Sequence, residues 1–244
     1  MNNAYINLSE LDTKRFGIVS ARANIVSAGN LPEINAFCRS HQVKFLIART
    51  SSSDIKAVHS MEADGFRLMD TLVYLQNNIK SFIPEPILQD FTIQALDISK
   101  VPDVIEVARE SFTGYQGHYH VDPRLDPLLA TEVYTSWAER CCTDGLVANH
   151  VITAMVKDRV VGFKSMRLNS SEQAEFVLAG VLSEMRGRGI YNALATEGLR
   201  WCKAAGATQV LTSTLLTNKA VQNASTRLGF RAFKSYHTFH KWFD

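Results

Sequence analysis

The chain contains Val181-Leu182-Ser183-Glu184-Met185-Arg186-Gly187-Arg188-Gly189-Ile190-Tyr191 between an apolar run that starts at Phe176 and a helical pattern that starts at Ile190. The sequence therefore predicts a strand, a glycine loop and a helix. The first N–H groups of such a helix lack partners within the helix, and the helix dipole presents positive charge to the loop. Because Arg186 and Arg188 add two full positive charges, we expect the loop to bind a phosphate or a pyrophosphate.

The pattern of the loop narrows the kind of phosphate ligand. No Gly-Lys-Ser/Thr ends it, which excludes a P-loop, and two glycines without a suitably placed acid do not make a dinucleotide-binding turn. The loop resembles Arg/Gln-x-x-Gly-x-Gly/Ala, the acyl-CoA pyrophosphate loop of the GNAT superfamily of N-acetyltransferases. Arg186, Gly189 and Tyr191 occupy its three fixed positions, with Tyr191 in place of the usual small residue. The alternative is an ordinary strand-to-helix turn with two arginines.

Length and composition describe a globular chain. Its 244 residues allow one large or two small domains. A composition of 46% hydrophobic and 20% charged residues is typical of a globular protein. The net charge of +2 argues against a nucleic-acid-binding protein. No apolar run is long enough to span a membrane and the N-terminus lacks signal-peptide features, so a cytoplasmic protein is expected. The cysteines Cys38, Cys141, Cys142 and Cys202 lack metal-site spacing and are expected to be small buried hydrophobes.

Two blocks are predicted, residues 1–86 and residues 87–244, joined near the proline-containing segment 81–86. In the first block, the patterns predict strand 16–23, helix 31–41, strand 44–48, helix 54–63 and strand 68–75. In the second block, they predict strand 91–96, helices 101–112 and 128–141, strands 151–156, 160–168 and 175–182, the glycine loop with its helix, strand 209–215, helix 219–228 and terminal strands over 232–242.

This order of elements is similar to the GNAT fold from about Phe91 to the C-terminus. The resemblance implies an α/β (α+β) protein with a central mixed sheet flanked by helices, preceded by a smaller, partial GNAT-like domain. The first block also echoes the end of the second: Lys56-Ala57-Val58 before Gly65-Phe66-Arg67 mirrors Lys219-Ala220-Val221 before Gly229-Phe230-Arg231. A truncated copy of the C-terminal half and a chance similarity of two β-α-β segments both remain open. In either case we expect the first block to pack against the second or to shape its substrate site.

The resemblance also implies acetyl-CoA as the cosubstrate. In this fold the fourth strand diverges from the fifth, and the pantetheine arm pairs with the free strand edge. Asn218 stands where family members often carry an Asn that contacts this arm, although Asn is also a favoured helix N-cap. The implied cofactor-binding residues are Ala179, Gly180, Val181, Arg186, Gly187, Arg188, Gly189, Ile190, Tyr191 and Asn218.

Three residues are candidates for catalysis. Many relatives carry an acidic Tyr seven residues after the Asn, where this chain has Ser225, a much poorer acid than a phenol. Ser225 could still donate a hydrogen bond to the leaving thiolate, and Tyr191 or Tyr236 are the alternative phenols. Glu175 stands where one branch of the superfamily carries its general base, and the alternative is a surface Glu at the start of a strand.

The segment 115–127 is rich in His, Tyr, Asp and Pro and lies between the first two predicted helices of the second block. In the GNAT fold this loop covers the acceptor, so His118, Tyr119, His120 and Arg124 are candidate substrate-binding residues. A structural loop held by aromatic packing is the alternative. The His-Tyr-His pattern has no identifiable third ligand, so no metal site is expected.

This loop, the two-block layout and the ending 236–242 look like the branch that acetylates dTDP-4-amino-4,6-dideoxy sugars for surface polysaccharides such as lipopolysaccharide. The resemblance implies N-acetyl transfer from acetyl-CoA to the amino group of a nucleotide-linked aminosugar by direct attack. A protein, peptide or small-amine acceptor and a non-catalytic acyl-CoA-binding module are the alternatives. The expected partner is a small-molecule substrate rather than nucleic acid or membrane, and a homodimer is one option for the oligomeric state.

Overall fold

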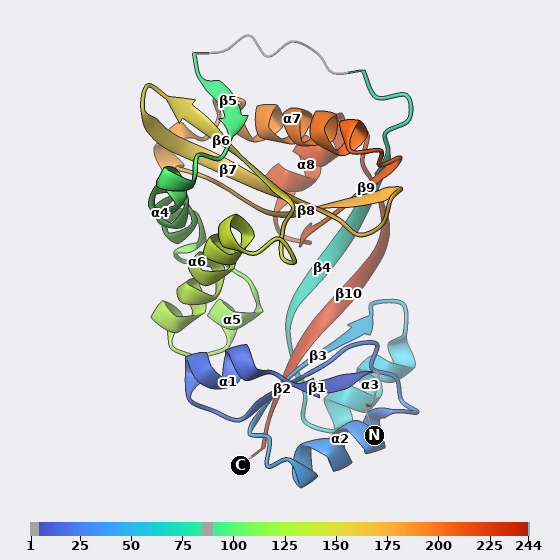
Figure 1. Cartoon of the computed structure of the whole chain (residues 1–244). Helices are drawn as coiled ribbons and strands as arrows, with labels where there is room; N and C mark the ends of the chain where they lie inside the picture. The colour runs from blue at the N-terminus through green and yellow to red at the C-terminus, as the bar shows by residue number, and fades with distance from the viewer. Residues whose placement is uncertain (1–4, 84–89, 244) are drawn as a thin grey trace.

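In the computed structural model, which describes residues 5–83 and 90–243, all strands belong to one ten-stranded sheet (Figure 1). Its order is β1-β2-β3-β10-β4-β9-β8-β7-β6-β5. The strands are β1 (Ile6–Leu8), β2 (Ser20–Ala23), β3 (Phe45–Ser51), β4 (Arg67–Asn78), β5 (Thr92–Ala95), β6 (His150–Val156), β7 (Arg159–Leu168), β8 (Gln173–Val181), β9 (Gln209–Leu215) and β10 (Arg231–Trp242). The sheet is mixed, since β2–β3 and β8–β9 are parallel and the other pairs are antiparallel. The α/β fold expected from the sequence is confirmed, whereas the predicted boundary between residues 86 and 87 lies outside the described residues.

Helices cover both halves of this sheet. They are α1 (Glu10–Phe16), α2 (Leu31–Ser40), α3 (Ile55–Ala63), α4 (Val101–Phe112), α5 (His118–Val121), α6 (Pro127–Thr143), α7 (Ile190–Ala204) and α8 (Lys219–Arg227), with short 3-10 turns at Ile98–Lys100 and Ser183–Met185. Local signals set their starts: the side chain of Asp54 accepts from Ala57 N ahead of α3, and that of Asp126 accepts from Leu128 N ahead of α6. No helix in the described ranges has both the length and the apolar composition needed to cross a membrane.

The N-terminal segment differs from its prediction. A strand was expected over residues 16–23, but Phe16 ends α1 and the strand begins only at Ser20. Ser9 caps this helix, Gly17 ends it in the left-handed conformation at φ 67°, and the fully buried Asp12 anchors it through an ion pair with Arg22. A seven-residue helix shows too few turns to reveal its period in the sequence.

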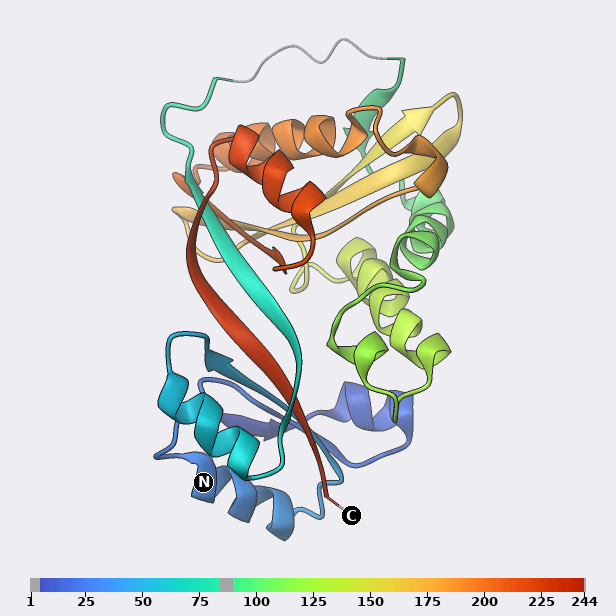
Figure 2. The same cartoon turned by 180° about the vertical axis from the view of Figure 1, so that it is seen from behind.

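The sequence echo corresponds to two structural units of the same size. Each unit, β3-α3-β4 and β9-α8-β10, contains a strand of seven residues, a helix of nine and a strand of twelve. A left-handed glycine, Gly65 or Gly229, follows each helix. The units interlock, because β10 lies between β3 and β4 while β4 lies between β10 and β9 (Figure 2). The terminal strands expected over 232–242 are therefore one long strand that joins both blocks.

Of the three hydrophobic clusters among the described residues, the two larger ones lie at the two ends of the long strands. One, under α4, α6 and α7, includes Phe163, Leu194 and Leu199, and the other, around α2 and α3, includes Leu46 and Met61. The twisted pair β4–β10 runs between them (Figure 2). The face left between the two packed ends is where the candidate site forms.

Candidate active site

A gap opens between β8 and β9. The two strands pair only from Gln173–Glu175 to Gln209–Leu211, and beyond this point they diverge. The opposite edge of β8 remains paired with β7 as far as Val181. The edge of β8 from Phe176 to Val181 that faces β9 therefore has no strand partner in the described structure, and an extended amide-containing arm would fit there as an additional strand.

The glycine loop lies at the open end of this gap. After the turn Ser183–Met185, the backbone is left-handed at Gly187 (φ 78°) and at Gly189 (φ 80°), and α7 begins at Ile190. No side chain caps this helix, so its first N–H groups face the loop. The predicted strand, loop and helix are thus confirmed. The side chain of Arg186 lies over the end of β8, with Nε 3.4 Å from the carbonyl oxygen of Val181.

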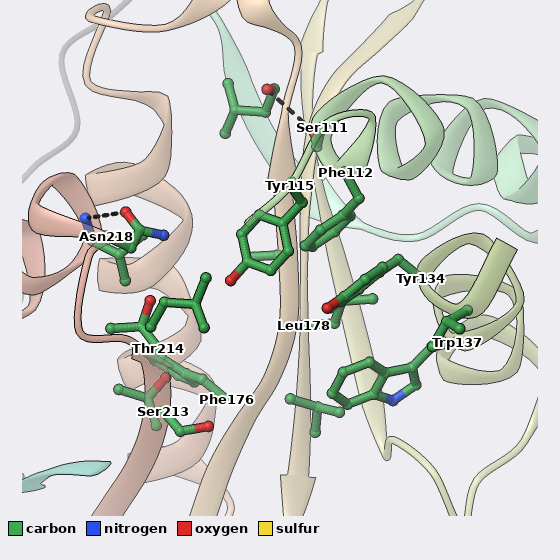
Figure 3. A pocket seen from close by; sticks show the side chains of 18 of the residues that line it. Ser111, Phe112, Tyr115, Tyr134, Trp137, Phe176, Leu178, Ser213, Thr214 and Asn218 are labelled. Atoms are coloured by element: carbon green, nitrogen blue, oxygen red, sulfur yellow. Dashed lines mark hydrogen bonds between the residues drawn. The ribbon is translucent and has the colours of Figure 1, made fainter. Parts of the chain in front are cut away.

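One cleft of about 1980 Å³ joins the loop, the gap and the N-terminal block. From the second block it is lined by Arg186, Gly187, Gly189, Ile190, Tyr191, Asn218 and the free edge of β8. From the first block it is lined by Arg15, Arg22, Arg49, Asp70, Leu72 and Tyr74. Figure 3 shows the aromatic side chains of Phe112, Tyr134 and Trp137 on one side of it and Ser213, Thr214 and Asn218 on the other.

Most of the expected cofactor residues share this cleft, including Ala179, Gly180 and Val181. Asn218 both lines the cleft and caps α8, since its side chain accepts from Val221 N at 3.2 Å. Packing against α4 requires a glycine at position 180, because a Cβ there would lie 2.8 Å from Ser111 Oγ. Arg188 instead points away, with its guanidinium 3.9 Å from the Asp90 carboxylate.

The phenols of the cleft differ from the expected set. Burial raises the pKa of Tyr115 to about 12, with the charge on Asp70 adding to the effect. Burial also raises the pKa of Tyr191 to about 12, against a hydrogen bond with Ser225 that lowers it. Figure 3 shows the Tyr115 hydroxyl directed into the space between the two walls. Both phenols therefore remain protonated at neutral pH and can act as hydrogen-bond donors.

Ser225, Tyr236 and Glu175 take three different positions. Among the described residues, the cleft lining includes Glu175 but neither Ser225, which is 3% exposed beneath it, nor Tyr236. Tyr236 packs edge-on against Tyr74, with ring centroids 5.4 Å apart. Glu175 lies where β8 still pairs with β9, and its carboxylate accepts from Arg167 at 2.8 Å.

Lys164 is a site residue that the sequence reasoning missed. It is 2% exposed in β7, and its Nζ lies 4.4 Å from the ring centroid of Phe176 and 4.6 Å from that of Tyr191. Burial lowers the pKa of this amine to about 7. The available signal was a lysine within the apolar run 160–166 of the predicted strand 160–168.

We expect Lys164→Met to change how stability depends on pH. The pKa of the amine falls from 10.5 unfolded to about 7 folded, so the buried charge destabilises the fold fully below pH 7 and not at all above 10.5. At about 1.4 kcal/mol per pKa unit, the effect is on the order of 5 kcal/mol. Urea unfolding between pH 6 and 10 should show wild type gaining stability relative to Lys164→Met as pH rises. Lys219→Met, at an exposed lysine, is the control. If the free energy of unfolding of wild type and of Lys164→Met depended on pH in the same way, the lowered pKa of the Lys164 amine would be refuted.

The segment 115–127 is divided between the cleft and a buried polar network. His118 and Tyr119 line the cleft, but the Tyr119 hydroxyl donates to Asp12 Oδ1 at 2.8 Å. Asp122 only accepts, so His240 donates to it from Nδ1 at 2.7 Å, and His240 Nε2 shares a hydrogen bond of 2.9 Å with His118 Nδ1. These bonds fasten α5 to strand β10 and to the N-terminal block.

His120 and Arg124 lie away from the cleft lining that the described residues form. His120 Nε2 is 3.1 Å from the Thr131 hydroxyl, and the Arg124 guanidinium stacks over Trp242 at 4.2 Å from its centroid. Within the described part of the chain, no group of three or more His, Cys, Asp or Glu side chains is arranged to hold a metal ion.

The diverging strands β8 and β9 and the left-handed glycine loop open into one continuous cleft. A model of the acetyltransferase (GNAT) family matches residues 103–230, more than half of the chain. The chain therefore belongs to the acetyltransferase (GNAT) family. A comparison with curated proteins found no match.

Solved structures show the same fold at low sequence identity. A GCN5-related N-acetyltransferase from Sphaerobacter thermophilus is 14% identical with a TM-score of 0.64, covering 97% of this chain and 76% of its own. A tandem GNAT protein from the clavulanic acid biosynthesis pathway is 14% identical with a TM-score of 0.62, covering 91% and 75%. A glucosamine N-acetyltransferase region of a fungal multi-domain β-N-acetylglucosaminidase is 11% identical with a TM-score of 0.66, covering 97% and 31%. The likeness extends over the N-terminal block as well as the family-matched part.

Proposed function

We propose that this chain transfers the acetyl group of acetyl-CoA to the amine of a nucleotide-linked aminosugar, of the dTDP-4-amino-4,6-dideoxy kind used in surface polysaccharides. The observation that carries the proposal is the continuity of one cleft from the glycine loop, through the β8–β9 gap, to the wall formed by β3 and β4. Acetyl-CoA entering from the loop and an acceptor entering from the N-terminal side would meet at the gap.

The lining of the acceptor side supports a large anionic substrate. Arg49 and Arg140 line the cleft, and Arg140 Nε is a buried donor without a hydrogen-bond partner among the described residues. Guanidinium groups suit a diphosphate, and the rings of Trp137 and Tyr74 offer flat surfaces for a base or a sugar. The fungal region of similar fold is a glucosamine N-acetyltransferase, and glucosamine is also an aminosugar.

The transfer proceeds by direct attack. The amine nitrogen forms a bond to the thioester carbon, the C–S bond breaks, and CoA departs as a thiolate. Glu175 takes the proton from nitrogen through water in the cleft and returns it to solvent, while the Tyr115 hydroxyl donates a hydrogen bond to the sulfur and the released thiolate takes a proton from solvent. Tyr191, which is hydrogen-bonded to Ser225, is the second candidate for this hydrogen-bond donor.

Free-thiol release tests this function. Incubation with acetyl-CoA and dTDP-4-amino-4,6-dideoxygalactose should release CoA thiol and yield the N-acetylated sugar nucleotide. A short peptide with a free N-terminus and spermidine are the comparison amines, and neither should support comparable release. If only the peptide or only spermidine were acetylated, that amine and not the sugar nucleotide would represent the acceptor class. Tight CoA binding without thiol release on any amine would identify a non-catalytic acyl-CoA-binding module.

A further inference from the structure

The N-terminal block places one carboxylate on the wall of the cleft. On β4, Asp70, Leu72 and Tyr74 alternate along the strand and all line the cleft. Leu72 forms the last pair with β9, at Leu215, and Asp70 lies two residues beyond it, opposite Thr238 of β10. Asp70 of β4 therefore lies just beyond the end of β9, the strand that borders the gap beside β8.

The two oxygens of Asp70 differ in their partners. Oδ2 accepts from the backbone N–H of His118 at 2.9 Å, which fixes the carboxylate against α5. Oδ1 is buried and has no hydrogen-bond partner among the described residues. A buried carboxylate oxygen without a donor costs free energy, so a donor supplied by a bound molecule would complete the site.

Neighbouring groups place this oxygen near the chemistry. The charge on Asp70 acts on the hydroxyls of both Tyr115 and Tyr134, and Tyr115 also senses Tyr191 from the cofactor side. Tyr115 and Tyr191 both line the cleft together with Asp70. A carboxylate oxygen that can only accept suits the N–H groups of an amine.

We propose that the N-terminal block supplies an amine-binding subsite to the cleft, in which Asp70 Oδ1 accepts a hydrogen bond from the amine that is to be acetylated. The inference rests on the proposed function and extends it, because it gives the N-terminal block a direct part in acceptor recognition. Asp70 holds the amine, while His118 holds Asp70. Arg49 on the neighbouring wall is left for the anionic part of the acceptor.

Calorimetry on the CoA-saturated full chain tests the subsite. The probes are dTDP-4-amino-4,6-dideoxygalactose, a short peptide with a free N-terminus and spermidine. We expect at least one probe to bind wild type and to lose about tenfold or more in affinity in Asp70→Asn. Asp103→Asn, an exposed carboxylate on α4 outside the cleft lining, should bind as wild type does. An unchanged CoA affinity shows that Asp70→Asn is folded.

The outcomes separate the two proposals. If the peptide or spermidine binds in a way that depends on Asp70 and the sugar nucleotide does not bind, the subsite is supported and the proposed acceptor is wrong. If the sugar nucleotide binds equally well to wild type and to Asp70→Asn, the acceptor is supported and the subsite is overturned. The absence of binding by all three amines would also overturn the subsite. A second measurement needs no variant: wild type should bind the 4-amino sugar nucleotide more tightly than its 4-hydroxy counterpart, and equal binding would overturn the subsite.

Discussion

Arg186→Glu should weaken the binding of CoA by about a hundredfold or more. The substitution removes a charge-assisted partner of the pyrophosphate and places a negative charge against it, at a loop whose helix N–H groups already face the ligand. Calorimetric titration of CoA into wild type and variant measures the change. Pantetheine, which lacks the pyrophosphate, should bind both proteins alike.

Arg231→Glu is the matched control for this charge reversal. Arg231 is an exposed arginine at the start of β10 and lies outside the cleft lining. Its reversal should leave the affinity for CoA within about twofold of wild type, since exposed charges at a distance are screened by salt. If Arg186→Glu bound CoA as tightly as Arg231→Glu does, the pyrophosphate would lie elsewhere.

Tyr115→Phe should lower kcat by about a hundredfold or more, because positioned proton donors contribute about 10² to 10⁴ to rates. The Tyr115 hydroxyl is directed into the cleft and burial holds its pKa at about 12, so the wild-type phenol is a donor throughout the neutral range. The KM for acetyl-CoA should change much less, since the loop and the strand edge bind most of the cofactor. Steady-state thiol release with the accepted amine measures both constants.

Ser225→Ala and Tyr236→Phe are the comparison variants for this prediction. Ser225 is buried beneath the cleft and Tyr236 packs on Tyr74, so each loss should reduce kcat far less than the loss of the Tyr115 hydroxyl. A full loss of kcat in Ser225→Ala with normal turnover in Tyr115→Phe would return the role of donor to the position that the resemblance implied.

Local patterns predicted much of the fold. Helix α4 and strand β9 begin and end where the sequence predicted, because Pro102 favours the first turn of a helix and alternating burial marks the strand. The glycine loop was also predicted, since glycine is the residue type that tolerates the left-handed backbone found at Gly187 and Gly189. These features depend on neighbours along the chain.

The other half of the site depends on contacts between distant segments. Asp70 reads as one polar residue in a predicted strand, and only the insertion of β10 beside β4 places it against His118. Lys164 likewise reads as a strand residue until α7 brings Tyr191 over its amine. The replacement of Ser225 by Tyr115 as the proposed donor required the position of a loop, which spacing along the sequence does not give.

A crystal structure of the CoA complex tests the central claim most directly, through the distance between the CoA sulfur and the Tyr115 hydroxyl oxygen. We expect the arm to lie in the β8–β9 gap beyond the Gln173–Glu175 pairing, with the sulfur within about 4 Å of that hydroxyl. A pyrophosphate away from the Arg186 loop, or a sulfur that faces away from the N-terminal wall, would contradict the account.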